Sequence, residues 1–125
     1  MRASLIVAAA LLTATSALAH HSNSAFDPDK VVVLKGTVTQ WKWTNPHVWI
    51  FLSVDDGKGG KTSWEIEGRP PGVLARAGWS KTILKAGDTI TVDFSPAKDG
   101  SRSGLTTRVT LADGTVLSNA PPALP

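Results

Sequence analysis

Residues 31–54 read VVVLKGTVTQWKWTNPHVWIFLSV, and this stretch decides the fold. Its first part, residues 31–43, is rich in β-branched and aromatic side chains, which predicts a long strand. Gly36 within it predicts a bulge or a sharp bend, because glycine adopts backbone angles that other residues avoid. After the turn signal at residues 44–46, apolar and other side chains alternate over residues 47–54, as in a strand with one buried face.

The chain after residue 54 predicts more strands and one helix. Pro70 and Pro71 suit a first helical turn, and Gly78 suits a C-terminal stop, so a short helix is expected between them. The strand-like segments are residues 62–67, 89–94, 104–111 and 116–117. In the last long one, Leu105 and Thr107 are expected on the same face, together with Val109 and Leu111.

The order of these elements indicates the fold class. Three strands, a helix and two strands, with a long first strand, match the OB-fold, a five-stranded and partly open barrel. A small β-sandwich is the competing architecture, but it would not need a helix between the third and fourth strands. We therefore predict an all-β protein with an OB-like barrel over residues 31–117 and one short helix between strands 3 and 4.

The first nineteen residues predict a signal peptide. Arg2 gives a positive start, residues 5–12 form an apolar run, and Ala17 and Ala19 are the small residues before a cleavage point. Cleavage after Ala19 would release a periplasmic protein. No later apolar run approaches the roughly 20 residues of a membrane span, so no membrane anchor is expected after processing. Residues 20–30 then form an extended arm, and residues 118–125 a disordered tail.

Composition narrows the function. Cysteine is absent, which excludes disulfides, thiolate metal sites and a cysteine nucleophile. Loss of Arg2 leaves 12 of the 13 basic residues against 10 acidic ones, a formal net charge of +2. Because the lysines and arginines are scattered rather than gathered in a stripe, nucleic acid is not an expected partner.

Six segments carry a family resemblance. They are AHHS at 19–22, LKGTV at 34–38, WTNPHVW at 43–49, GW at 78–79, LKAGD at 84–88 and AKDGS at 97–101. Together they resemble an uncharacterised family of small exported bacterial proteins, known only as a domain of unknown function. The resemblance implies export and one compact β domain, and it implies no catalytic residues.

One face of the second strand is the candidate binding surface. His47 follows an Asn-Pro turn and would lie in the loop beside the usual ligand face of an OB-fold. We expect Trp43, Asn45, His47 and Trp49 to form an aromatic outer face that holds an unknown small ligand or a periplasmic protein. In the alternative, the arm, the helix or a partner subunit covers these rings, and His47 bonds a neighbouring carbonyl. The chain is thus predicted to be a non-enzymatic binding module.

The alternative function is copper binding. Cleavage after Ala19 would make His20 the N-terminus, and a free amine with neutral imidazoles binds Cu(II) well. His20, His21 and His47 would form the site, which is similar to the histidine brace of some exported copper proteins. The ten-residue arm reaches about 33–36 Å and would run back along about 40 Å of strand, unless a bend at Gly36 shortens that path.

An enzyme is the third reading and is not expected. Glu65 and Glu67 share a face of the third predicted strand, and paired carboxylates are able to do acid–base work. A hydrolase would need a pocket that joins His47 to one of them.

Overall fold

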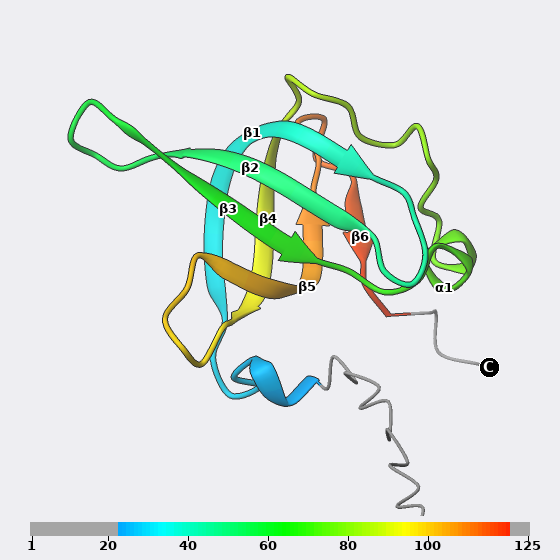
Figure 1. Ribbon diagram of the computed structural model, residues 1–125. Helices are drawn as coiled ribbons and strands as arrows, with labels where there is room; N and C mark the ends of the chain where they lie inside the picture. The colour runs from blue at the N-terminus through cyan, green and yellow to red at the C-terminus, as the bar shows by residue number, and fades with distance from the viewer. Residues whose placement is uncertain (1–22, 121–125) are drawn as a thin grey trace, which may run out of the picture.

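The computed structural model describes residues 23–120, so the predicted cleavage point, His20, His21 and the last five residues lie outside it (Figure 1). The elements in chain order are η1 (Asn23–Ala25), β1 (Val32–Lys42), β2 (Trp49–Asp55), β3 (Lys61–Glu67), α1 (Pro71–Arg76), β4 (Thr89–Pro96), β5 (Ser103–Thr110) and β6 (Val116–Ser118). Within residues 23–120, no helix is both long and apolar enough to cross a membrane.

The strands form one closed sheet. Their order is β3-β2-β1-β4-β5-β6, and a parallel pairing of β3 with β5 closes the first five strands into a barrel. The short helix α1 follows β3 and lies at one end of that barrel, close to the turn between β1 and β2 (Figure 1). The OB-like fold predicted from the strand order is confirmed, with β6 added to the edge of β5.

Strand β1 is long because it serves two neighbours. Val32–Thr37 pair with β4, and Thr37–Lys42 pair with β2. The register of the second pairing shifts between Val38 and Gln40. The predicted bulge at Gly36 is therefore wrong in position. Glycine is needed at residue 36 because a Cβ there would lie 2.8 Å from the carbonyl oxygen of Ser53.

The core fills the barrel. The alternation predicted over residues 47–54 is confirmed, since Val48, just before β2, and Ile50 and Leu52 within it are each 1% exposed. Burying an aliphatic side chain of this size contributes about 1.5–3 kcal/mol, so this one face does much to hold the sheet closed. The other buried apolar residues are Val38, Val54, Ile66, Leu74, Trp79, Leu84, Ile90, Val92, Phe94, Val109 and Leu117.

The helix segment anchors one end of the barrel. Pro71 opens the helix, and Gly78 at φ +90° ends it in the left-handed region where glycine is favoured, as predicted. The indole nitrogen of buried Trp79 donates to the carbonyl oxygen of Ser118 at 2.7 Å. This bond ties the segment after α1 to β6.

Part of the predicted arm is described. η1 lies in it, and Phe26 forms an isolated antiparallel bridge with Ala97 just after β4. The backbone N–H of Asp27 donates to the carbonyl oxygen of Pro96 at 2.9 Å. Residues 26–27 are thus fastened to the end of β4.

Candidate functional site

An imidazole and a carboxylate meet on the outer face of the barrel. The register of β2 with β3 sets Trp49 opposite Glu67, and His47 lies two residues before Trp49 on the same face. His47 is therefore the diagonal neighbour of Glu67 across the two strands. Its Nδ1 lies 2.5 Å from Oε1 of Glu67, a short charge-assisted contact. The alternative expectation, a bond from His47 to a carbonyl, is not what the structure shows.

Glu67 is buried although it faces outward. The residue is 4% exposed, because Trp49 flanks it from β2 and Leu105 flanks it from β5. A buried carboxylate costs several kcal/mol unless it is paired and hydrogen-bonded. The Nδ1–H of His47 supplies that donor, which leaves Nε2 of the ring to face another group.

A cavity of about 390 Å³ adjoins this pair. The cavity lies beyond the end of β3 at Glu67. There β5 continues past β3 and pairs with β6 from Arg108 onward. Its walls are joined through Asn119, whose side-chain oxygen accepts the backbone N–H of Arg69 at 3.1 Å. The N–H of Asn119 in turn donates to the carbonyl oxygen of Thr107 at 3.1 Å.

Thr106 lines the same cavity and carries an unsatisfied hydroxyl. The residue is 2% exposed, and within residues 23–120 its Oγ1 is the buried side-chain polar atom that lacks a hydrogen-bond partner. Its neighbour Thr107 differs, since that hydroxyl donates to the carbonyl oxygen of Asp93 at 2.9 Å. A buried group without a partner costs about 1–3 kcal/mol, so the native fold tolerates a penalty at residue 106.

Opposite charges line the cavity without pairing with each other. Glu67 is buried, whereas Arg69 is exposed at the next outward position of the chain. Among the ion pairs of residues 23–120, Glu67 is joined to His47 and none involves Arg69. The cavity is therefore lined by one acidic and one basic residue that do not pair with each other.

The four residues predicted to form one aromatic face are divided among three places. His47, in the loop just before β2, lies on the same outer side as Trp49 of β2, and Trp49 is half-buried. Trp43 instead packs with Trp41, their ring centroids 5.7 Å apart, and lines a separate hollow of about 310 Å³. Asn45 is exposed in the turn between β1 and β2.

The tryptophan cluster around Trp43 supports the fold. The Trp41 ring stacks on buried Trp79 at a centroid distance of 6.0 Å, and its indole nitrogen donates to the carbonyl oxygen of Lys81 at 3.0 Å. Trp41 and Trp43 are both half-buried against the core. These rings brace β1 against the segment that follows α1, so their packing is accounted for without a ligand.

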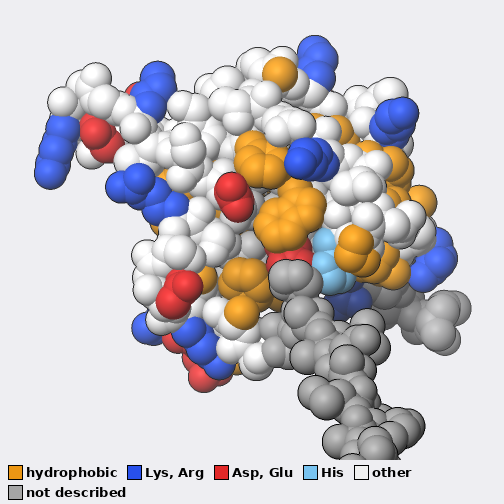
Figure 2. Space-filling model, viewed as in Figure 1, with side chains coloured by type: hydrophobic (Ala, Val, Ile, Leu, Met, Phe, Trp, Pro, Cys, Tyr) orange, Lys and Arg blue, Asp and Glu red, His pale blue; other side chains and the backbone are white. Residues whose placement is uncertain are grey.

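The rest of the outer face mixes apolar and charged groups. The Lys42 ammonium lies 5.4 Å from the centroid of the Phe51 ring, a cation–π distance, and Phe51 pairs with Glu65 on β3. Figure 2 shows hydrophobic side chains gathered near the middle of this face, with acidic and basic side chains around them. The apolar area is thus interrupted by charge.

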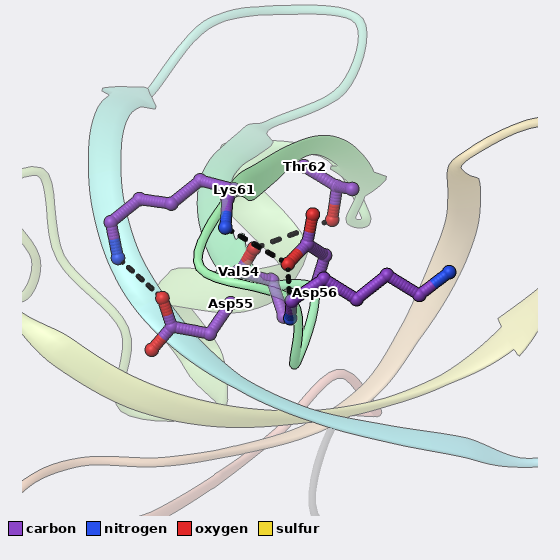
Figure 3. A network of polar contacts seen from close by, with 7 residues as sticks. Val54, Asp55, Asp56, Lys61 and Thr62 are labelled. Atoms are coloured by element: carbon purple, nitrogen blue, oxygen red, sulfur yellow. Dashed lines mark hydrogen bonds and ion pairs between the residues drawn. The ribbon is translucent and has the colours of Figure 1, made fainter.

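The loop between β2 and β3 is held by polar contacts far along the strands from His47 (Figure 3). Lys61 Nζ lies 2.6 Å from Asp55 Oδ1. Asp56 accepts the backbone N–H groups of Lys58 and Gly60, and these bonds lower the pKa of its carboxyl below the ordinary value. The contacts shape the turn and do not reach the cavity.

Sequence reasoning missed Arg69, Thr106 and Asn119. Thr106 was not singled out because regular alternation was expected to place Leu105 and Thr107 on the same face as Val109, with Thr106 on the other. The register between β4 and β5 shifts between Asp93 and Phe94, and Thr106 is buried while Thr107 is exposed. Gly68-Arg69 directly after a predicted strand was the available signal for Arg69, since a strand end next to a ligand face often carries function.

The described residues bear on both the metal hypothesis and the enzyme hypothesis. Within residues 23–120, no group of three or more His, Asp or Glu side chains is placed to hold a metal ion, and His20 and His21 lie outside that range. A cavity does join His47 to Glu67, while Glu65 is exposed away from it. None of the hydrogen bonds found in residues 23–120 links His47 to a hydroxyl that could serve as a nucleophile.

Comparison with known proteins settles the family. A family model described as a family of unknown function, DUF6152, matches residues 8–108. The chain belongs to the DUF6152 family. This agrees with the resemblance drawn from the sequence motifs. No curated protein matches this DUF6152 chain.

One solved structure confirms the fold. The mitochondrial single-stranded DNA-binding protein Rim1 of S. cerevisiae superposes with a TM-score of 0.51 and 12% sequence identity. The match covers 66% of the DUF6152 chain and 94% of Rim1. At this identity the likeness shows a shared OB-type barrel and nothing about the ligand.

Proposed function

We propose that this DUF6152 protein is an exported, non-enzymatic binding module that holds a small polar ligand in the cavity beside His47 and Glu67. One observation carries the proposal: Glu67 is only 4% exposed although its side chain faces outward, away from the core of the barrel. A charge placed there adds nothing to core packing and costs desolvation energy. Recognition of a ligand would explain its presence.

The position of the cavity agrees with the way OB barrels bind. Such barrels use the outer face of strands 2 and 3 and the loop between strands 1 and 2. Here that loop supplies His47, β3 supplies Glu67, and Trp49 adds an apolar wall next to them. The geometry therefore favours a ligand that spans this loop and the end of β3.

Rim1 is named for binding single-stranded DNA, and we infer that the DUF6152 chain has a different ligand. Sites for single strands combine a positively charged groove with stacked aromatic side chains. The corresponding face here carries Glu65 and Glu67, which would repel phosphates, and Lys42 is occupied over the Phe51 ring. A small polar molecule fits the charges better.

Nuclear magnetic resonance tests the proposal. The ¹⁵N-labelled protein starting at residue 20 is titrated separately with L-alanine, propionate, ethylammonium, glycerol and glucose to 20 mM. The proposal expects at least one of them to shift the amide signals of residues 67–69 and 105–107 in a saturable way. It is overturned if none does, or if the saturable shifts lie around Trp41 and Trp43 instead.

Copper binding is the second candidate, and one contact favours it. Carboxylates commonly hold one nitrogen of a metal-binding histidine so that the other nitrogen meets the metal. Glu67 holds Nδ1 of His47 in this way, which leaves Nε2 as a ligand. The site would require His20 and His21 of an N-terminus cleaved after Ala19.

Calorimetric Cu(II) titration tests this candidate. The protein that starts at His20 is compared with one that carries an extra N-terminal glycine and with His47→Ala. Tighter binding by the protein that starts at His20 than by both variants supports a site built from the N-terminal amine and His47. Equal affinity in all three removes that site.

A further inference from the structure

The inner wall of the cavity needs hydrogen-bond donors. His47 serves Oε1 of Glu67, but an ionised carboxylate offers about four acceptor positions. Glu67 lines the cavity, and a charged donor that contacts it there interacts more strongly than in water, because the buried position has a low dielectric constant. A ligand with a positively charged N–H group suits this wall, and an anion does not.

The rim of the cavity needs an acceptor. Arg69 is exposed, and its backbone is fixed by Asn119 on one side and by a 3.4 Å bond from the N–H of Val48 to its carbonyl oxygen on the other. A guanidinium on a fixed backbone presents a planar set of donors that matches a carboxylate. Among residues 23–120, Arg69 forms no ion pair, so no acidic side chain of that range already neutralises it.

The buried wall also holds a hydroxyl that lacks a partner. Thr106 lines the cavity, but its Oγ1 is itself buried and offers no exposed surface to a ligand. The volume of about 390 Å³ lies at the small end of the range of about 300–1,000 Å³ that is usual for small-molecule sites. A ligand of a few carbon atoms fits better than an oligomer.

We propose that the cavity binds a small zwitterion, a free α-amino acid, with its ammonium group toward Glu67 and its carboxylate toward Arg69. The inference rests on the proposed function and names the ligand class of the same site. Charge complementarity at both ends carries it, since a buried acid and an exposed base line one cavity without being paired to each other. A purely anionic or purely cationic molecule would leave one of these two groups unmatched.

Isothermal titration calorimetry with L-alanine as the probe tests this inference. Ethylammonium and propionate are the matched ligands, since each keeps one charged end of alanine and lacks the other. We expect alanine to bind at least tenfold more tightly than either. The inference is overturned if propionate or ethylammonium binds as tightly as alanine.

Protein variants locate the two ends of the ligand. We expect Arg69→Gln to weaken alanine binding at least fivefold while leaving ethylammonium binding unchanged. We expect Glu67→Gln to weaken alanine binding as well, while leaving propionate binding unchanged. Arg102→Gln, an exposed arginine outside the cavity, is the matched control and should bind alanine like the parent. Unchanged alanine affinity in Arg69→Gln would refute the assignment. Arg69 is exposed, so its replacement leaves the buried contacts intact, whereas replacement of Glu67 changes a buried contact.

The outcomes separate this inference from the proposed function. Saturable binding of glycerol or glucose at residues 67–69 and 105–107, with no binding of alanine, overturns the zwitterion and supports a ligand site there. Absence of binding by alanine and by every other member of the panel overturns both.

Discussion

Replacement of Thr106 by valine is expected to make the protein more stable. Valine has the shape of threonine without the hydroxyl, and the Oγ1 of Thr106 is buried with no partner among residues 23–120. Removing such a group recovers its desolvation cost, about 1–3 kcal/mol, without opening a cavity. We expect the free energy of unfolding to rise by about 1–2 kcal/mol. For the 98 described residues, each kcal/mol corresponds to a Tm increase of about 4–8 °C.

The adjacent threonine provides the matched control. The hydroxyl of Thr107 donates to the carbonyl oxygen of Asp93 at 2.9 Å, so Thr107→Val should lower the free energy of unfolding by about 1 kcal/mol. Urea unfolding followed by tryptophan fluorescence measures both variants, and an unchanged m-value shows that the comparison is valid. If Thr106→Val is less stable than the parent, its hydroxyl has a partner in solution and the reasoning about the cavity wall is wrong.

Three further changes test the account of the fold. Gly104→Ala should lower the free energy of unfolding by about 1–3 kcal/mol in urea titrations, because a Cβ there would lie 2.1 Å from the Phe94 ring; an unaltered urea midpoint would contradict this packing. Trp79→Phe should lower the free energy of unfolding by about 1–3 kcal/mol in the same titrations, because the bond to Ser118 and part of the side-chain volume are lost. A decrease below about 0.5 kcal/mol, the size expected of a neutral surface substitution, would argue against that anchor. Hydrogen bonds from donors two to four residues away hold the pKa values of four turn carboxyls below the ordinary 3.8, at Asp56, Asp88, Asp99 and Asp113. A lowered folded-state pKa stabilises the protein above the unfolded value, so the stability that these four carboxyls contribute should be lost as the pH drops below about 4. The urea midpoint should therefore fall there, and a midpoint that does not change below about pH 4 would count against these bonds.

The barrel was predictable because its signals are local. Alternation in β2 identified the buried face, and Pro71 and Gly78 marked the two ends of the helix segment. These features depend on side-chain polarity and backbone angles within a few residues. The order of the elements then sufficed to indicate the OB-type barrel.

The candidate site was only partly predictable because it depends on register. His47 was found from its place after the Asn-Pro turn, but its partner Glu67 follows from the alignment of β2 with β3. The regular alternation expected from Leu105 to Leu111 is broken, because the register shift on β4 between Asp93 and Phe94 is produced by pairing and not by any residue type in β5. A single strand read alone does not contain that information.

The proposed ligand site is tested most directly by intermolecular nuclear Overhauser effects. The panel member that binds most tightly is added to the ¹³C,¹⁵N-labelled protein, and contacts from ligand protons to protein protons are recorded. The account predicts contacts to the methyl groups of Leu105 and Thr106 and to the ring protons of His47, which together enclose the cavity. Contacts confined to the rings of Trp41 and Trp43 would place the ligand in the other hollow and contradict the account.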